Sequence, residues 1–218
     1  MSEYMKIIFD RMVSLVCLSI FSITANAMQG PNVILVVADD LGYGDIGVNG
    51  QDLIKTPHLD SMAREGVQLS NFYASAPNCT PSRAGLMTGR YAIRMGLAAK
   101  VLFVEDTHGL PENELSLAEM FRDNAYATAM LGKWHLGHSA EHWPTSHGFE
   151  YFFGLPYSNN QTPLALYRNE SIIEKPVIQS TLTQRYTNEA IKFLKSRGKQ
   201  PFFLYIAHTF PHVPLHVS

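Results

Sequence analysis

The chain has 218 residues, a formal net charge of −2 and 46% hydrophobic residues, values typical of a globular protein with one sizeable core. Lysine and arginine total 17 against 19 aspartates and glutamates, and the sequence contains no basic run. This balance gives no support for nucleic-acid binding, so nucleic-acid partners are not expected.

The first residues have the features of an export signal. Lys6 and Arg11 precede an apolar run over residues 12–23, and Ala25-Asn26-Ala27 supplies the small-x-small pattern of a signal peptidase site. We therefore predict a signal peptide over residues 1–27 and an exported protein, periplasmic or secreted, or lysosomal in a eukaryote. The run is short for a membrane span, so no stable membrane anchor is expected, although an uncleaved anchor is the alternative.

Strands and helices alternate along the rest of the chain. Residues 33–38 form an unbroken apolar run, which is typical of a strand buried on both faces. Capping and periodicity predict helices over 57–65, 116–124 and 182–197, and further strands over 67–73, 126–131 and 201–207. Residues 143–177 are rich in Pro, Asn and aromatics and are expected to form ordered loops. This order predicts one α/β domain over residues 28–218.

Cys79 is expected to be the only cysteine of the mature chain, because Cys17 lies in the predicted signal peptide. An exported thiol with no disulfide partner is a liability unless it is buried or used. Its neighbours Asn78, Thr80 and Ser82 are polar, and Arg83 follows one helical turn later. The pattern favours use, at a site that binds an anion.

Asp39-Asp40 follow the first predicted strand, at the sheet edge where ligands of α/β proteins gather. Adjacent carboxylates there favour a hard divalent cation such as Ca²⁺ or Mg²⁺, with a helix-capping or loop role as the alternative. The glycines of residues 42–47 fit the spacing of a dinucleotide-binding loop. Residues 48–52 are a poor helix start, however, and the aspartates would repel phosphates, so nucleotide binding is not favoured.

Lys133 and His135 follow the strand predicted over 126–131, and alternation along an extended segment places them on one side. A fixed positive charge beside a group that transfers protons suits an anionic substrate, although a lone histidine is more often structural.

Three further histidines recur at intervals of four near the end of the chain: His208, His212 and His216. On one helix they would share a face, as zinc ligands often do, but Pro211 and Pro214 break any such helix, so we interpret the spacing as accidental. His208 remains a candidate site residue because it follows the strand predicted over 201–207. A hydrolase that uses Cys79 together with one of these histidines is a further interpretation, but no local motif supports it.

The motifs together resemble those of type I sulfatases, in the alkaline phosphatase superfamily. The resemblance runs from about Asn32 to the end of the chain and is strongest toward arylsulfatases and lysosomal N-acetylgalactosamine-6-sulfatase. Three motifs carry it: Cys79-Thr80-Pro81-Ser82-Arg83 followed by Thr88-Gly89-Arg90, Gly132-Lys133-Trp134-His135, and Asp39-Asp40-Leu41-Gly42. It implies an alkaline-phosphatase-like sandwich, with a mostly parallel or mixed central sheet flanked by helices.

The resemblance also implies a chemistry. Cys79 would be oxidised to Cα-formylglycine by a formylglycine-generating enzyme, which reads Pro81 and Arg83 as part of its signal. One hydroxyl of the hydrated aldehyde would attack the sulfur of an aryl or carbohydrate sulfate ester, and the alcohol or phenol would leave. The second hydroxyl would then lose its proton and expel sulfate, which a plain thiol or serine could not do.

The resemblance assigns a role to each matching residue. Asp39 and Asp40 would bind Ca²⁺ together with residue 79, with Mg²⁺ the less expected ion. The other residues act on residue 79 or on the substrate: Arg83 would hold the formylglycine, Lys133 would clamp the sulfate, His135 would contact the diol, His208 would protonate or orient the leaving oxygen, and Ser158 would contact the site.

Two departures from the family pattern bear on these expectations. Ala125 stands where the family usually has glycine, for which we expect a local adjustment. The sequence given ends at Ser218, before a further pair of metal ligands, a second sulfate-binding lysine and a smaller C-terminal domain. We therefore expect the N-terminal part of a catalytic domain, truncated and inactive or nearly so alone.

Two alternatives to a sulfuric ester hydrolase remain open. One is a phosphonate monoester or phosphodiester hydrolase that uses the same formylglycine. The other is a truncated, non-catalytic protein that binds sulfated glycans. The expected partner is a sulfated small molecule or glycan, whose identity the residues do not select.

Overall fold

The computed structural model describes residues 30–217, so the signal peptide predicted over residues 1–27 lies outside the described residues. The residues from Asn32 onward form one compact unit. None of the helices described between residues 30 and 217 has the length and apolar character needed to cross a membrane.

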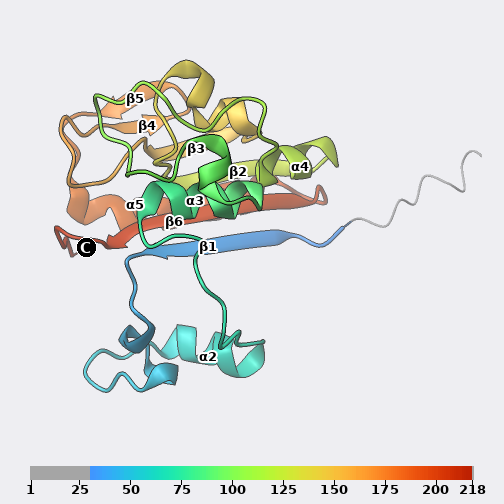
Figure 1. The fold of residues 1–218 in the computed structure, drawn as a ribbon. Helices are drawn as coiled ribbons and strands as arrows, with labels where there is room; N and C mark the ends of the chain where they lie inside the picture. The colour runs from blue at the N-terminus through green and yellow to red at the C-terminus, as the bar shows by residue number, and fades with distance from the viewer. Residues whose placement is uncertain (1–29, 218) are drawn as a thin grey trace, which may run out of the picture. The chain divides into compact units, whose positions relative to one another are not determined.

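The described part of the chain contains a six-stranded mixed sheet with the order β1-β6-β2-β3-β4-β5 (Figure 1). Neighbours among β1, β6, β2 and β3 are parallel, and β4 and β5 add an antiparallel edge. The strands are β1 (Val33–Asp39), β2 (Ala127–Lys133), β3 (Tyr151–Leu155), β4 (Leu166–Arg168), β5 (Ser171–Glu174) and β6 (Phe202–Pro211).

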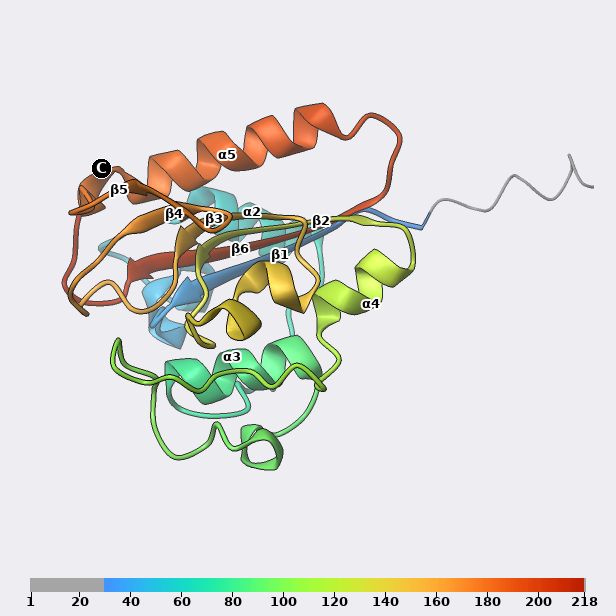
Figure 2. The same ribbon diagram turned by 90° about the horizontal axis from the view of Figure 1, so that it is seen from above.

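Helices pack on both faces of this sheet. Helix α5 (Leu182–Ser196) covers one face, and α3 (Cys79–Thr88) and α4 (Leu117–Asp123) lie on the other (Figure 2). A hydrophobic core lies on each face of the sheet, and successive side chains of β6 point into one core and then the other. Leu204 packs with Tyr186 of α5, whereas Phe203 and Tyr205 pack on the side of α3. The predicted α/β sandwich with a mixed central sheet is confirmed.

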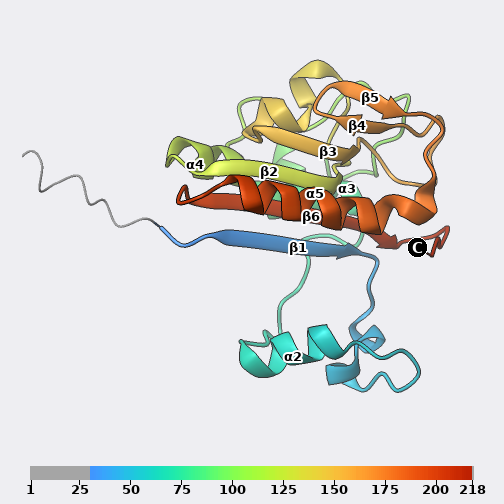
Figure 3. The same cartoon turned by 180° about the vertical axis from the view of Figure 1, so that it is seen from behind.

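A long segment between β1 and α3 contains α2 (Pro57–Glu65) and two 3₁₀ turns, η1 (Tyr43–Asp45) and η2 (Gly47–Asn49) (Figure 3). The glycines that mimic a dinucleotide-binding loop therefore lead into 3₁₀ turns. The N–H of Val48 donates to the Asp60 carboxylate at 2.7 Å, so this carboxylate stabilises the turn. A dinucleotide-binding loop leads into the N-terminus of an α-helix, whereas these glycines lead into 3₁₀ turns, so the geometry does not favour nucleotide binding.

Two predictions about secondary structure are wrong. Residues 67–73 form turns and irregular backbone with exposed side chains, and their loose alternation has no sheet neighbour to pair with. Residues 143–177, expected to be loops, contain β3, β4 and β5, which have five, three and four residues. Strands this short carry almost no periodic signal.

Four further 3₁₀ helices complete the described elements: η3 (Ala92–Met95), η4 (Ala140–His142), η5 (Pro144–His147) and η6 (Gln179–Thr181). The capping box predicted at the start of α4 is present, because Ser116 Oγ accepts the Glu119 N–H and the Glu119 carboxylate accepts the Ser116 N–H.

Candidate active site

The candidate site lies where β1 and β2 end and α3 begins. Both strands run parallel to β6, which lies between them, so their last residues meet at one edge of the sheet. Asp39 ends β1, Lys133 ends β2, and Cys79 is the first residue of α3. The fold thus brings together three residues that are 40 and 54 positions apart in sequence.

The sulfur of Cys79 is next to both an acidic and a basic group. It lies 3.9 Å from Asp39 Oδ1 and 3.3 Å from Lys133 Nζ, and it borders a pocket of about 240 Å³. The position at the first turn of a ten-residue helix adds the positive end of the helix dipole. The surroundings of Cys79 therefore favour an anion.

Asp39 is the centre of a buried ion-pair network. Its Oδ1 accepts a hydrogen bond from Arg83 Nη2 at 2.9 Å, and its Oδ2 accepts one from Lys133 Nζ at 2.5 Å. Burial alone would raise the pKa of Asp39, but the charges of Arg83 and Lys133 outweigh it and hold the pKa below its ordinary value. Asp39 is thus a carboxylate at any physiological pH.

Arg83 connects α3 to the sheet. Its Nη1 donates to the Lys133 carbonyl at 2.7 Å and lies 3.4 Å from the Tyr205 hydroxyl. The guanidinium is buried, and although burial lowers its pKa, Tyr205 and Asp39 raise it above the ordinary value. A planar, fully buried donor of this kind fixes the position of the helix that carries Cys79.

Gly132 allows Lys133 to enter the site. Its φ of +109° lies in the region that favours glycine, and a Cβ there would lie 1.9 Å from the Ala207 carbonyl oxygen of β6. Lys133 is completely buried, and its ammonium also donates to Ser158 Oγ at 3.0 Å. Ser158 therefore contacts the site from the segment after β3, as predicted.

Two of the four non-glycine residues with positive φ among the described residues lie at this site. Asp40 and His135 have φ angles of +63° and +61°, conformations that non-glycine residues adopt at a cost of about 1–3 kcal/mol. Each follows a strand that ends at the site. Such strain persists where the surrounding structure enforces it, and it clusters at functional sites.

His135, which the sequence analysis proposes as a proton-transfer residue, is buried. Desolvation and the nearby charge of Lys133 lower its pKa to about 3, so the ring is neutral near pH 7. A ring with so low a pKa is a weak base at pH 7, so the neutral imidazole is suited to hydrogen bonding there rather than to holding a proton.

His208 does not reach the cluster, and the expectation for its location is wrong. Strand β6 continues through Pro211, so His208 lies within the strand, where its ring packs 6.2 Å from the ring of Tyr186 on α5. That is the face of the sheet opposite α3. The β1–β6 register also shifts after the pair Ala38 and His208, so residues beyond the shift are the ones that reach the strand ends.

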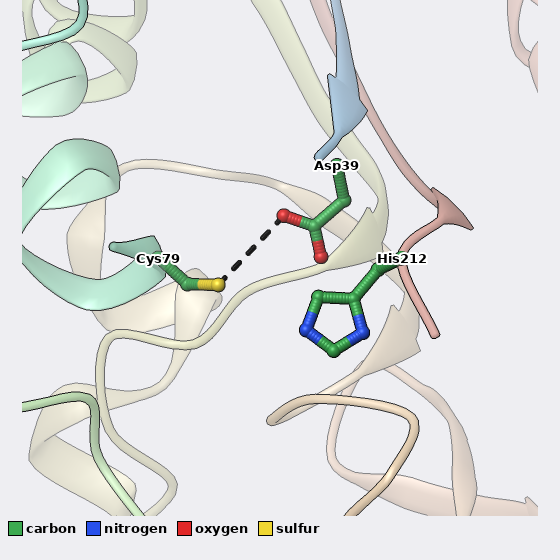
Figure 4. Close-up of side chains that lie close together, drawn as sticks. All are labelled: Asp39, Cys79 and His212. Carbon is green, nitrogen blue, oxygen red and sulfur yellow. Dashed lines mark hydrogen bonds between the residues drawn. The ribbon is translucent and has the colours of Figure 1, made fainter. Parts of the chain in front are cut away.

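His212 occupies the place that was predicted for His208. The Asp39 carboxylate, the Cys79 sulfur and a ring nitrogen of His212 lie within 4.8 Å of one another (Figure 4). His212 Nε2 lies 3.4 Å from Ser158 Oγ and 3.6 Å from Asp40 Oδ2. The only signal for His212 in the sequence is the recurrence of histidine every four residues, which the sequence analysis interprets as accidental.

The residues present match the donor preference of calcium in part. Asp39 and Asp40 supply carboxylate oxygens, and the exposed Asp40 side chain lines the pocket beside Cys79. Both Asp39 oxygens accept hydrogen bonds from cationic groups, so a metal would share that carboxylate with Arg83 and Lys133. Calcium takes six to eight oxygens, more than the described residues offer here.

Comparisons with known proteins identify the family of the chain. The family model described as Sulfatase matches residues 31–218, and the chain belongs to that family. It is 40% identical to arylsulfatase G of Mus musculus over 86% of the chain, and 38% identical to N-acetylgalactosamine-6-sulfatase of Homo sapiens over 89% of it. The chain spans 42% of the length of each relative.

A solved structure supports the same assignment. The crystal structure of Ps i-CgsB in complex with k-i-k-neocarrahexaose matches 85% of this chain and 46% of its own, with a TM-score of 0.75 and 33% identity. The crystal structure of PsFucS1 sulfatase from Pseudoalteromonas sp. matches 90% of this chain and 47% of its own, with a TM-score of 0.75 and 28% identity, so the chain shares its fold with a sulfatase.

Proposed function

We propose that this protein takes part in the hydrolysis of sulfuric esters, with residue 79 as the nucleophile after conversion of Cys79 to formylglycine. The observation that supports this proposal most is the position of the buried Lys133 ammonium, 3.3 Å from the Cys79 sulfur. A fixed, desolvated positive charge beside the attacking atom is what stabilises charge that develops on a sulfuryl oxygen.

The modified side chain fits this position. Cys79 borders the pocket, is partly exposed, and is a free cysteine, so a reagent or enzyme can reach it. The hydrated aldehyde would supply two hydroxyls on one carbon, one to attack sulfur and one to release sulfate. Lys133 would hold the sulfuryl oxygens, and His135, neutral and buried, would contact the diol by a hydrogen bond and so assist the elimination of sulfate.

His212 takes the role that the family resemblance suggested for His208. It lies beside Asp40 and Ser158 at the rim of the cluster, where it could face the ester oxygen that leaves the sulfur when residue 79 attacks. A histidine there can deliver the proton that an alcohol needs to depart.

Asp39 and Asp40 would hold the Ca²⁺, with residue 79 as a third ligand. A divalent ion held there would add positive charge beside the sulfuryl group, next to that of Lys133. The remaining oxygens would come from groups other than those of the described cluster.

The proposed substrate is an aryl or carbohydrate sulfate. The names of the two relatives support this range, because one is an arylsulfatase and the other acts on N-acetylgalactosamine 6-sulfate by its name. Export and modification by a formylglycine-generating enzyme remain predictions from the sequence.

Sulfate release from 4-nitrophenyl sulfate and from N-acetylgalactosamine 6-sulfate tests the proposal, with a phosphonate monoester assayed in parallel. We expect turnover of a sulfate ester, after coexpression with a formylglycine-generating enzyme, by a longer protein in which residues 28–218 are joined to the further metal ligands and sulfate-binding lysine that the resemblance implies, little or none by residues 28–218 alone, and none by the Cys79→Ala variant of the longer protein. Faster hydrolysis of the phosphonate would favour the phosphonate hydrolase. Sulfate-ester binding with no turnover by the modified protein would favour the non-catalytic alternative and refute the proposal.

The two histidines provide a matched test of the site. We expect His212→Asn to lower kcat by about 10²–10⁴, the range for loss of a general acid, and His208→Asn to change it less than about threefold. The reverse result would return the role to His208.

A further inference from the structure

The backbone of one residue, Leu102, holds the His135 ring from a segment remote in sequence. The Leu102 carbonyl oxygen lies 2.8 Å from His135 Nε2. A carbonyl oxygen only accepts hydrogen bonds, so Nε2 must carry the proton of the neutral ring. His135 Nδ1 is therefore the nitrogen with a free lone pair.

Two buried side chains hold Leu102 in turn. Thr80 Oγ1 accepts the Leu102 N–H at 3.0 Å and donates to the His135 carbonyl at 3.0 Å. Gln161 Nε2 donates to the Leu102 carbonyl at 2.9 Å, on the oxygen that also accepts from His135. Both hydrogen-bonding groups of the Leu102 backbone are thus held by side chains.

His135 Nδ1 is buried and has no hydrogen-bond partner among residues 30–217. Buried polar atoms in folded proteins nearly always have a partner, and the exceptions call for an explanation. Here the Nε2 bond uses one nitrogen for positioning and leaves the lone pair of the other free to accept a hydrogen bond.

We propose that Thr80 and Gln161 are positioning residues, which hold the Leu102 backbone so that His135 keeps its proton on Nε2 and the lone pair of its Nδ1 free to accept a hydrogen bond. Thr80 directly follows Cys79 in α3, so its side chain connects the helix that carries Cys79 to the backbone of His135. The purpose of this arrangement rests on the proposed function, whereas the tautomer itself is a property of the folded chain.

The ¹⁵N chemical shifts of the His135 ring at neutral pH test this inference, with the His135→Asn variant used to assign the signals. We expect Nε2 to appear protonated and Nδ1 unprotonated in the native protein. Thr80→Val removes the hydroxyl with little change of shape, and we expect it to shift the tautomer ratio roughly tenfold toward Nδ1–H. Gln161→Met removes the bond to the Leu102 carbonyl and the 3.4 Å contact of Gln161 Nε2 with His135 Nε2, but it leaves both Thr80 bonds, and it should shift the ratio less.

Thr128→Val is the matched control. Thr128 is as buried as Thr80 and has the same bond pattern, since its hydroxyl donates to the Gly148 carbonyl and accepts the Glu150 N–H. We expect this variant to lose comparable stability and to keep the native tautomer. Thr80→Ser, which keeps the hydroxyl, should restore the native ratio.

The possible results separate the inference from the proposed function. A protonated Nδ1 in the native protein overturns the inference, and so does an equal ratio in Thr80→Val and Thr128→Val. If Thr80→Val does not fold, Gln161→Met and the native protein decide the question by the same signals. The measurement needs no turnover, so a native Nε2–H tautomer in a protein without sulfatase activity would refute the proposed function and leave the positioning intact.

Discussion

The charged cluster at the ends of β1 and β2 and the segment between β1 and α3 are opposite in burial. Lys133 and Arg83 are 0% and 4% exposed although both are cations. Leu53 and Val67 are 93% and 86% exposed although both are apolar. In the described structure, position in the fold rather than polarity decides which of these side chains are buried. Substitutions in the cluster should therefore change stability much more than substitutions in the exposed segment.

The largest difference is expected between the two adjacent aspartates. Asp39→Ala leaves Arg83 and Lys133 buried without their shared counter-charge, and we expect it to lower the free energy of unfolding by about 3–5 kcal/mol. Asp40→Ala changes an exposed side chain and should cost less than about 0.5 kcal/mol. Urea denaturation of both variants measures the difference, and equal losses would contradict the assignment of Asp39 as the centre of the network.

Acid should weaken the cluster through His135. The pKa of His135 falls from an ordinary value of 6.5 to about 3 in the folded chain, so below pH 6.5 the unfolded chain binds a proton that the folded chain does not. This contribution is complete above pH 6.5 and is lost as pH falls toward 3, at about 1.4 kcal/mol per pH unit. Denaturation of the native protein and of His135→Gln between pH 6.5 and 4 should show the steeper slope in the native protein. Parallel slopes would contradict the burial of a neutral His135.

A smaller gain in stability is expected at Ala125, the position where the family usually has glycine. Its φ is +64°, a conformation that glycine adopts without the steric cost of a Cβ. We expect Ala125→Gly to raise the free energy of unfolding by about 0.5–1 kcal/mol, after the entropy that glycine adds to the unfolded chain is subtracted. Thermal unfolding provides the measurement, and a lower midpoint in the variant would show that the strain is relieved in another way.

The smallest effect is expected in the exposed segment. Leu53→Lys replaces a side chain that has almost no contact with the described structure, so we expect a change within about 0.5 kcal/mol. A loss of more than 2 kcal/mol would show that Leu53 is buried in solution and would remove the contrast with the cluster.

The sequence predicted the centre of the site well, because strands that run parallel bring their carboxyl ends together. Asp39 and Lys133 could be placed at those ends from the apolar runs before them. Cys79 could be placed beside them only through its motif, because its distance to β1 depends on how α3 packs.

The errors in the prediction have physical causes. His208 was chosen because a strand was expected to end at residue 207, whereas β6 extends to Pro211 and its register with β1 shifts after His208. No local pattern signals either feature, since both arise from pairing with β1. Strands β3, β4 and β5 were missed for a related reason, because sheet neighbours rather than periodicity stabilise strands of three to five residues.

The most direct test of the site is the chemical state of residue 79. The protein should be purified after coexpression with a formylglycine-generating enzyme, and the peptide that contains Cys79 analysed by mass spectrometry with and without an aldehyde-reactive hydrazide. We predict that the peptide has lost its sulfur and forms the hydrazone, while the Arg83→Ala variant keeps the thiol. An unmodified thiol at residue 79 in the folded native protein would contradict the proposed reaction.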